Sequence, residues 1–553
     1  MSTGVLTNLK SLSENADKVQ NDLLLSIIKK NAGTEYGKKY DFAHIDSIQE
    51  YQNKVPLTDW EHYEDYISRM LKGEENILSA DSTAFYCISA GSTDQPKYVP
   101  LTANDIEIQR KYWIDGVEEC INDYLLKRPG TTDRRKIFYI GEFFRTFMEN
   151  GTMSGVRAGA PYRFMETEDT IDYDLFTAPK EVLFPDKLED MLYMKLRFAL
   201  AERSVTAIHG IFVHKIVGLF DYLCKNWDAF IKDIGTGSVS DQFCISEEWK
   251  SYLSENLPPD PARANELKNI FPGDGGNLAI KIWPDLKYVC VAGGSLFARY
   301  MKSLKKYFGI TPIHYFVYAT SESNIGISLR INDEDAYYTM LPDAAFYEFL
   351  PVDGDAARPL TAWEVEKGKE YELIATTLSG LYRYSVQDVV KVVDFYGRMP
   401  VISISYRKNQ LLNLADEKIN TRQLEQATDL LASRMGTGIS DYCVDAGNNE
   451  NGAKPGYIIY IETEMGRSNN DKKCSEIVDK ALRDSSAGYR LARENDRLRE
   501  AQVISLKKGA FRSYGAYLSN HGYRMEQNKP LRIITSDEQR DFFTRKAGEL
   551  NRT

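Results

Sequence analysis

The chain has 553 residues, of which 43% are hydrophobic and 27% are charged, a balance typical of a globular protein. Its 80 Asp and Glu residues outnumber 69 Lys and Arg residues, and the formal charge of -11 excludes the basic surface that DNA, RNA or an anionic membrane would attract. This length exceeds what one compact core supports, so we expect a large domain and at least one smaller one.

The N-terminal stretch lacks a basic segment followed by an apolar core, and no run approaches the roughly 18 apolar residues of a membrane span. We therefore expect a cytoplasmic protein. Seven dispersed cysteines without CxxC spacing predict reduced, mostly buried thiols rather than disulfides or a zinc site. His209 and His214 lie in an apolar run, which favours a place in the core or a pocket wall over metal binding.

The first hundred residues contain two helical patterns and one strand pattern. Apolar residues at helical spacing predict a helix over 21–30 and another within 56–75, the second entered through Thr58 or Asp59 as its N-cap. Aromatic and apolar residues at 83–88 then predict a strand, whose end is where phosphate-binding loops lie in open α/β sheets.

The middle of the chain alternates between helical and strand patterns. Helical spacing is present at 187–202, 211–232 and 296–307. Apolar runs typical of strands lie at 286–293 and 314–320. This alternation predicts α/β layers. Residues 337–405 contain strand-like segments broken by Asp, Gly and Pro turns, which predict a meander or a barrel-like subdomain.

The polar run at 407–410 is the best candidate for a domain boundary, because a new strand-then-helix pattern follows it. That pattern predicts a second, smaller α+β domain. Its loops at 446–456 and 465–473 are rich in Gly, Asn and charge, so we expect them to be exposed and mobile.

Ser89 to Lys97, with the sequence SAGSTDQPK, is the most informative segment. Backbone N–H groups freed by a glycine, hydroxyl donors and one lysine together suit a polyphosphate. Asp94 opposes this interpretation, because its carboxylate would repel phosphate. The alternative is an ordinary turn with a solvated Lys97.

Two further segments carry residues suited to a nucleotide. Tyr318, Ser321 and Glu322 end an apolar run with a ring that can stack on a purine, a hydroxyl that can donate to phosphate and a carboxylate that can hold Mg²⁺. Asp388 lies just before an apolar strand, where it can accept hydrogen bonds from ribose hydroxyls. The alternatives are a surface loop for the first segment and a turn, or a salt bridge with Arg383, for the second.

These motifs carry a family resemblance. Gly91 to Lys97 resembles the SGTTGxPK signature of adenylate-forming enzymes, and YATSE at 318–322 resembles their YGxTE. More closely, the chain resembles the Gretchen Hagen (auxin-responsive promoter) family of acyl-acid amido synthetases. The likeness follows the chain in order over nearly its whole length, through VPLTDWEHYEDYISRM, WPDLKYVCVAGGS, FVYATSESNIGIS, GLYRYSVQDVVKV, YRKNQLLNLADEKI and NHGYRMEQNKPLR.

The resemblance implies an α/β fold with a large N-terminal adenylation domain over 1–406, a hinge at 407–410 and a mobile α+β C-terminal domain over 411–553. It also implies a ligase. A small, aromatic or otherwise apolar carboxylate would attack the α-phosphate of Mg·ATP to give an acyl-adenylate and pyrophosphate. An amine, expected to be an amino acid, would then displace AMP to form an amide.

The resemblance further implies the roles of individual residues. The ATP and AMP site would comprise Ser89, Gly91, Ser92, Thr93, Lys97, Gly293, Gly294, Ser295, Tyr318, Ser321, Glu322, Asp388 and Arg407. Glu322 would hold Mg²⁺, while Asp388 and Arg407 would bind the ribose. Lys529 of the C-terminal domain would act in catalysis with Lys97, by neutralising charge on the reacting carboxylate and phosphate. Without the resemblance, Lys529 would be taken for a solvated surface lysine.

Four residues depart from the family pattern. Asp94 stands where the family has a small residue or a glycine, and Ala90 stands where it has a serine. Ser385 and Gln387 stand where the family has an arginine and a glycine, respectively. These changes bear on whether catalysis is weakened.

The acyl pocket of the family lies beside helices that match residues 187–202 and 208–220, so Phe212 and Val213 are candidates for its lining. Two alternatives to an amide synthetase stay open. One is an acyl-CoA ligase, which shares the first half-reaction. The other is a nucleotide- or ligand-binding protein in which Asp94 and Gln387 have silenced catalysis.

Overall fold

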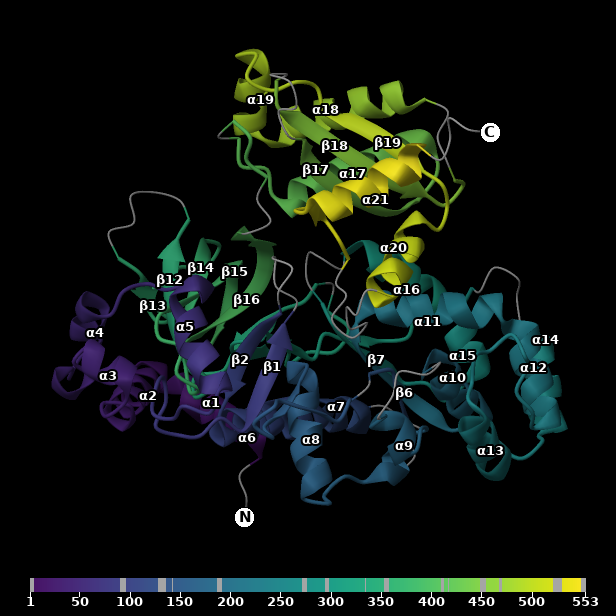
Figure 1. Cartoon of the computed structure of the whole chain (residues 1–553), viewed down its shortest axis with the longest axis horizontal. Coiled ribbons are helices and arrows are strands. Elements are labelled where there is room, and N and C mark those ends of the chain that lie inside the picture. Colours follow the sequence, from purple (N-terminus) through teal and green to yellow (C-terminus); the bar gives the residue numbers. More distant parts are fainter. Residues whose placement is uncertain are drawn as a thin grey trace. The chain divides into compact units, whose positions relative to one another are not determined.

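The computed structural model describes residues 4–89, 96–127, 136–141, 143–185, 191–270, 276–293, 298–333, 335–352, 358–408, 412–415, 417–447, 454–466, 470–520 and 530–548. They form two compact units, one reaching Ile404 and one beginning at Ser405, and the stretch Gln387–Val389 groups with the second (Figure 1). The predicted hinge at 407–410 lies just beyond this division. The mobility and functions expected of the two domains stay predictions.

The described part of the N-terminal unit contains three sheets. The first has the order β2-β1-β5-β4, with bounds Lys97–Leu101, Phe85–Ser89, Met153–Gly155 and Thr146–Phe147. The second is parallel, with the order β3-β6-β7-β8 and bounds Lys136–Tyr139, Val205–Phe212, Tyr288–Ala292 and Ile313–His314.

The third sheet has eight strands in the order β13-β12-β14-β15-β16-β11-β10-β9. Their bounds are Leu360–Thr361, Ala345–Pro351, Glu370–Thr377, Tyr384–Tyr396, Met399–Arg407, Tyr338–Met340, Asn324–Ile327 and Val317–Ala319. The predicted strand-rich segment at 337–405 therefore supplies strands β11 to β16 of this sheet.

Helices surround these sheets. Those of the first half of the unit are α1 Val5–Glu14, α2 Ala16–Lys30, α3 Glu35–Lys39, α4 Ile48–Lys54, α5 Trp60–Leu71, α6 Ala103–Arg110, α7 Val117–Leu126, α8 Ala160–Thr167 and α9 Lys180–Leu183. Those of the second half are α10 Met191–Ala201, α11 Val213–Lys225, α12 Trp227–Thr236, α13 Glu247–Asn256, α14 Pro261–Ile270, α15 Leu278–Ile282 and α16 Ala298–Phe308. A π-helical turn, η2 Lys111–Gly116, joins α6 to α7, and a short 3₁₀ turn, η3 Arg157–Gly159, precedes α8.

The parallel sheet is covered by helices because its strands are buried on both faces. Tyr288 to Val291 of β7 are all buried, as a continuous apolar run of this kind predicts. Helices α11 and α16 lie beside each other on this sheet (Figure 1). Their inner faces join one large hydrophobic core that includes Phe220, Trp283 and Phe308.

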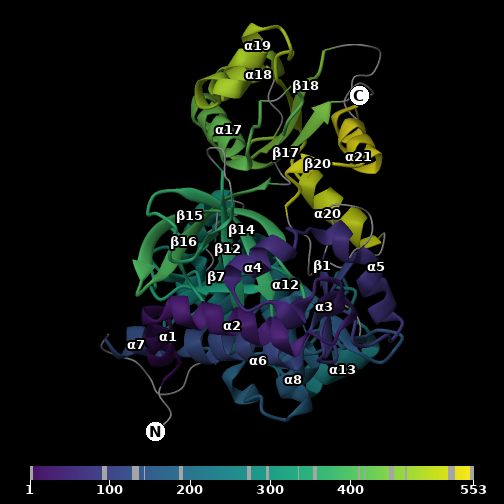
Figure 2. The same ribbon diagram turned by 90° about the vertical axis from the view of Figure 1, so that its left-hand side faces the viewer.

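The C-terminal unit is an α/β layer structure around one sheet. The order is β19-β18-β17-β20, with bounds Gln502–Leu506, Gly456–Thr463, Ile439–Gly447 and Ile533–Ile534. Figure 2 shows the helices on either side of its strands, with α17 Thr421–Met435, α18 Asp471–Ser485 and α19 Ala487–Glu494 on one face and α21 Asp537–Gly548 on the other. A further helix, α20, spans Ala510–Asn520.

Two hydrophobic clusters follow from the alternation of side chains along these strands. On β18, Ile459 and Ile461 pack with the α17–α19 cluster, whereas Tyr460 between them packs with Phe542 and Phe543 of α21. The helix of the strand-then-helix pattern predicted after 407–410 is α17, which begins with a capping box formed by Asn420 and Gln423. The strand of that pattern is wrong for the described residues before α17, where Leu412 and Ile419 form only an isolated bridge.

Most predicted elements are present, with two corrections. The pattern at 211–232 is two helices, because β6 extends to Phe212 and the helical run breaks at Asn226 between α11 and α12. The apolar run at 314–320 is split between β8 and β9. The predicted strand at 83–88 is β1, and the antiparallel strand β2 pairs with it, so the loop between them belongs to a hairpin. Asp59, not Thr58, caps α5 by accepting from the His62 N–H.

No helix within the described ranges has the length and apolar character that a membrane crossing requires. The structure describes all seven cysteines; none of them forms a disulfide and five are buried, as the sequence predicts.

Strand β15 contains a residue in a conformation that favours glycine. Gln387 has a φ of 62°, in the left-handed region, where the family pattern has glycine. A side chain there costs roughly 1 kcal/mol or more, because Cβ approaches the backbone carbonyl. With Gln387 in place of the family's glycine, β15 is therefore more strained at this position. Asp388, the next residue, still lies in the strand.

We expect Gln387→Gly to raise the free energy of unfolding by up to about 1 kcal/mol, because the strain relieved exceeds the chain entropy that glycine adds. Lys391→Gly is the control, since Lys391 lies in the same strand with ordinary φ and is also half-buried. It should lose about 0.5–1 kcal/mol. Urea unfolding measures the free energy of unfolding of both variants. Equal losses in the two variants would contradict the assignment of strain to Gln387.

Candidate functional site

The β1–β2 hairpin brings the two ends of the Ser/Gly/Thr loop together. Ser89, the last residue of β1, is the register partner of Lys97, the first of β2. The Lys97 Nζ lies 5.2 Å from the centre of the Trp60 ring on α5, a cation–π contact that holds the lysine at the base of the loop. Of the residues expected to bind phosphate, Gly91, Ser92 and Thr93 lie outside the described residues, as does Asp94.

Glu322 lies at the turn that joins β9 to β10. The Thr320 hydroxyl oxygen accepts from the N–H groups of Glu322 and Ser323, each at 3.3 Å, and the Thr320 N–H donates to the Ser323 carbonyl. The Tyr384 hydroxyl, from the start of β15, donates to Glu322 Oε1 at 3.1 Å. The turn and the hydroxyl together fix the direction of the Glu322 carboxylate.

A buried ion pair lies beneath this turn. The Arg157 guanidinium pairs with Asp105 of α6, and the side chains of both are about 95% buried. Arg157 also donates to the Ser321 carbonyl at 3.0 Å and to Asn324 Oδ1 at 3.4 Å, so it holds both ends of the turn that carries Glu322. Asp105 accepts in addition from the Asn324 amide at 3.1 Å and from the Ser379 hydroxyl at 2.9 Å.

Strand β1 also lies close to this turn. Burial raises the pKa of the Cys87 thiol to about 11, and Ser321 and Glu322 are among the groups that act on it. Because Cys87 is two residues before Ser89, the base of the Ser/Gly/Thr loop and the Glu322 turn belong to one neighbourhood. The structure thus brings together two of the three segments that the sequence singles out.

Tyr318 and Gly293 are held mainly by the core. Tyr318 is only 5% exposed, and its ring packs against Tyr338 with centres 5.6 Å apart. This exposure leaves little ring surface on which a purine could stack. The position of a Cβ on Gly293 is filled by the Tyr315 ring, 2.3 Å away, so this glycine is required by packing within the protein. Gly294 and Ser295 lie outside the described residues.

Asp388 and Arg407 form the pair expected at the ribose. The Arg407 Nε donates to Asp388 Oδ1 at 2.7 Å, and Asp388 is 4% exposed while Arg407 is partly open. The alternative salt bridge between Asp388 and Arg383 is wrong. Arg383 is buried and instead binds both carboxylate oxygens of Glu348, at 2.9 and 3.0 Å.

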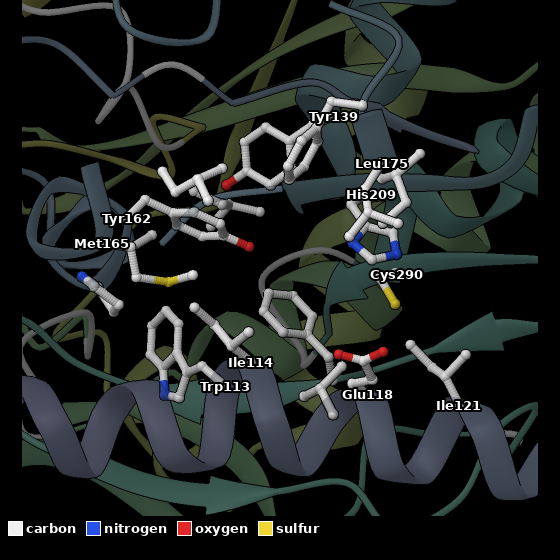
Figure 3. A pocket seen from close by; sticks show the side chains of 18 of the residues that line it. Trp113, Ile114, Glu118, Ile121, Tyr139, Tyr162, Met165, Leu175, His209 and Cys290 are labelled. Carbon is white, nitrogen blue, oxygen red and sulfur yellow. The ribbon is translucent and has the colours of Figure 1, made fainter. Parts of the chain in front are cut away.

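A cavity of about 140 Å³ lies in the N-terminal unit, between the parallel sheet and the helices around η2, α7 and α8. Figure 3 shows its walls, which are mostly aromatic and aliphatic. The η2–α7 segment contributes residues at helical spacing: Trp113, Ile114, Val117, Glu118 and Ile121. The other walls include Tyr139, Tyr162, Met165, His209, Cys290 and Phe316.

The two residues expected to line the acyl pocket do not line this cavity. Val213 begins α11 and is fully buried, and the Phe212 ring stacks on His214. The cavity is lined instead by the preceding residues of β6, His209 to Ile211. His209 is therefore a pocket residue, one of the two places that the sequence predicts for it. Lys529 lies outside the described residues.

Sequence reasoning missed the Arg157 network and most of the cavity. An isolated arginine in VRAGAPYRF carries no signal that its partner is Asp105, 52 residues earlier. The helical spacing of Trp113, Val117 and Ile121 could have indicated a helix, but an apolar helical face is equally typical of a plain core.

Comparison with known proteins extends these observations. Three family models match this chain in order: the GH3 family N-terminal domain over residues 5–313, the GH3 family central domain over 338–407 and the GH3 family C-terminal domain over 422–538. Together they cover most of the chain.

Individual proteins are also similar to this chain over most of its length. The indole-3-acetic acid-amido synthetase GH3.3 of Arabidopsis thaliana is 27% identical, over 95% of this chain and 91% of the relative. The jasmonoyl–L-amino acid synthetase JAR6 of Nicotiana attenuata is 26% identical, over 96% of this chain and 93% of the relative. A solved structure, that of the GH3.15 acyl acid amido synthetase, has the same fold, with a TM-score of 0.86 at 23% identity over 98% of this chain and 95% of that chain.

We expect Arg157→Leu to lower the free energy of unfolding by about 3–5 kcal/mol, because it leaves the buried Asp105 carboxylate without its cation. Adding Asp105→Asn removes that charge while keeping an acceptor for Ser379, so the double variant should regain part of the loss. Urea unfolding of the three proteins tests this. A loss below about 1 kcal/mol in Arg157→Leu, or a double variant that is less stable still, would contradict it.

Proposed function

Since the chain belongs to the GH3 family, we propose that it is an ATP-dependent acyl-acid amido synthetase, which activates a carboxylic acid as its adenylate and transfers the acyl group to an amino acid. The products are the amide, AMP and pyrophosphate. The observation that carries the proposal is the match of all three family domains in their order along the chain, together with a fold shared with an acyl acid amido synthetase.

The chemistry requires charge neutralisation and positioning. A carboxylate has no good leaving group, whereas its adenylate releases AMP as a stabilised anion. Attack on the α-phosphate brings two anions together, so cationic and N–H donors around the phosphates lower the barrier. In this proposal Ser89, Lys97 and the loop residues Gly91, Ser92 and Thr93 bind the triphosphate. The cation–π contact with Trp60 keeps Lys97 at the loop, next to Ser89.

Asp388 and Arg407 would bind the ribose. A carboxylate accepts hydrogen bonds from both ribose hydroxyls, and Arg407 orients it through the 2.7 Å contact. Gly294 and Ser295 are proposed at the adenine. Gly293 is proposed there only through its backbone, because Tyr315 fills its side-chain space.

Glu322 fits the demands of Mg²⁺. This ion is held in nucleotide enzymes by one or two carboxylates together with substrate phosphates, and Glu322 supplies one carboxylate that is partly exposed and fixed by Tyr384. When bound, Mg²⁺ supplies charge stabilisation to the phosphates. The protein's own task at this point is to keep the Glu322 carboxylate in one direction, through the Thr320 turn and the Arg157 network beneath it.

The two domains would have different roles in the reaction. Residues 1–406 hold the acid and nucleotide, while 411–553, moving about the hinge at 407–410, carry Lys529 to the reacting groups. The cavity beside β6 and α7 is proposed as the acid site. Its aromatic and aliphatic walls suit an apolar acid.

Because ATP and amino acids are cytoplasmic metabolites, we propose that the enzyme acts in the cytoplasm, with neither a membrane nor a nucleic acid as partner.

The proposal is tested by ATP–pyrophosphate exchange with a panel of aromatic and apolar acids, followed by product analysis with amino acids or with CoA. We expect exchange with at least one acid and an amide product with an amino acid. Exchange followed only by thioester formation would assign an acyl-CoA ligase. Binding of ATP without exchange for any acid would assign a silent binding protein.

A second experiment tests Glu322. We expect Glu322→Gln to lower kcat roughly 100-fold and to raise the Mg²⁺ concentration for half-maximal exchange, because one charged ligand is lost. Tyr384→Phe, which removes only the hydroxyl that orients Glu322, should raise the Mg²⁺ requirement by up to about tenfold. Glu364→Gln is the matched control, since Glu364 pairs with Arg358 at the surface. An unchanged Mg²⁺ requirement in the first two variants would remove Glu322 from the metal site.

A further inference from the structure

One tyrosine holds the backbone just beyond the carboxyl end of β7. The strand ends at Ala292, so the N–H and C=O groups of Gly293 lie outside the strand ladder and need other partners. The Tyr338 hydroxyl serves both of them. It accepts from the Gly293 N–H at 3.2 Å and donates to the Gly293 carbonyl oxygen at 3.4 Å. Gly293 and Tyr338 are both buried, so loss of the hydroxyl would leave two polar groups away from water.

Close packing fixes the same stretch of backbone from another side. A Cβ on Gly293 would lie 2.3 Å from the Tyr315 ring and 2.8 Å from the Ala336 methyl group, so these two side chains already fill that space. Tyr338 is confined in its turn, because its Cβ lies 2.9 Å from the point where a Cβ on Gly326 of β10 would be. Gly293 is therefore held by packing and by two hydrogen bonds together.

The Tyr338 hydroxyl keeps its proton in these surroundings. Burial raises the pKa of this phenol well above its ordinary value, although the hydrogen bond from the Gly293 N–H opposes the rise. A neutral phenol can accept one hydrogen bond and donate another at the same time. The link to Gly293 is thus expected to persist over the whole pH range in which the protein is folded.

Tyr338 also contacts a second segment expected at the nucleotide. Its ring packs against Tyr318 of β9, with centres 5.6 Å apart, and Tyr318 is only 5% exposed. Because a purine finds little ring surface on Tyr318, recognition of the base falls to polar groups of the chain. In α/β sheets such groups lie at the carboxyl ends of parallel strands, which is the position of Gly293 after β7.

The two hydrogen bonds decide which group of Gly293 is left for a ligand. Its N–H is used by Tyr338, whereas its carbonyl oxygen has a second lone pair beyond the one that the hydroxyl occupies. Adenine carries an amino donor at position 6 of the purine, and a 6-oxo purine carries an oxygen acceptor there. A carbonyl oxygen held in place pairs with the amino group and repels the oxygen.

We propose that Tyr338 is a positioning residue of the nucleotide site: it holds the Gly293 carbonyl where this group accepts a hydrogen bond from a purine 6-amino group, and it thereby sets a preference for ATP over ITP. Tyr338 acts through Gly293 and does not touch the nucleotide. The inference rests on the proposed function, because it takes the nucleotide to be the ATP of the adenylation step.

The test measures equilibrium binding of ATP and of ITP to the full chain by calorimetry in the presence of Mg²⁺, so it requires no turnover. The two nucleotides share the ribose and the triphosphate and differ in the base. We expect the unmodified protein to bind ATP at least about tenfold more tightly than ITP, because the carbonyl is left unpaired by the 6-oxo base. Tyr338→Phe should weaken ATP binding about tenfold and bring the two affinities close to each other, since the carbonyl is no longer held.

Tyr51→Phe is the matched control. Tyr51 is an equally buried phenol of the same unit, its hydroxyl lies 2.7 Å from the Thr376 hydroxyl, and it belongs to none of the segments expected at the nucleotide. This variant also loses a buried hydrogen bond, but it should leave both affinities unchanged. Ala336→Gly removes the methyl group beside Gly293 and keeps the Tyr338 hydroxyl. It should weaken ATP binding about threefold with little effect on ITP, and it serves if Tyr338→Phe does not fold.

Two results would overturn the inference. One is equal binding of ATP and ITP by the unmodified protein. The other is an ATP preference that survives Tyr338→Phe, even if both affinities fall, because a tyrosine with only a structural role would weaken both nucleotides alike. ATP binding without acid-dependent pyrophosphate exchange would defeat the proposed function, whereas a preference lost in Tyr338→Phe would still support the inference. Absence of ATP binding would defeat both.

Discussion

The candidate site depends on one buried charge and the need to satisfy it. A guanidinium withdrawn from water is tolerated only where its N–H groups find acceptors. Arg157 finds three acceptors on two separate segments of chain: the Asp105 carboxylate, the Ser321 carbonyl and the Asn324 side chain. These partners lie on α6 and at both ends of the β9–β10 turn. The requirement that all of them converge fixes the turn that presents Glu322.

The same segment of chain connects the Glu322 turn to the cavity. Phe316 lines the cavity, Tyr315 fills the space beside Gly293, and β9 then leads to the turn at Ser321 and Glu322. Six residues of extended chain span at most about 20 Å, so Phe316 at the cavity and Glu322 at the turn are no farther apart than that. This segment of the N-terminal unit therefore links the cavity to the turn that carries Glu322.

The family and the details of the cavity carry different kinds of information. The shared fold and domain order support the reaction class, because the activation step uses the same groups whatever the acid. The names of the relatives refer to indole-3-acetic acid and jasmonic acid, and their identity to this chain is only 27% and 26%. The choice of acid depends on a few lining side chains, such as Glu118 and His209, which can change while the framework is kept.

The sequence by itself determined the local structure, the motifs and the resemblance to a family of amido synthetases. Helical spacing and caps are short-range signals, so α2, α5, α16 and α17 could be predicted, as could the strand that precedes the Ser/Gly/Thr loop. Only the tertiary structure decided which distant residues meet. Asp388 pairs with Arg407 and not with the nearby Arg383, Tyr318 is buried in the core, and Arg157 pairs with Asp105. Cross-strand register, not sequence distance, placed Tyr139, His209 and Cys290 in one wall, and no periodicity along a single strand records which neighbour it pairs with.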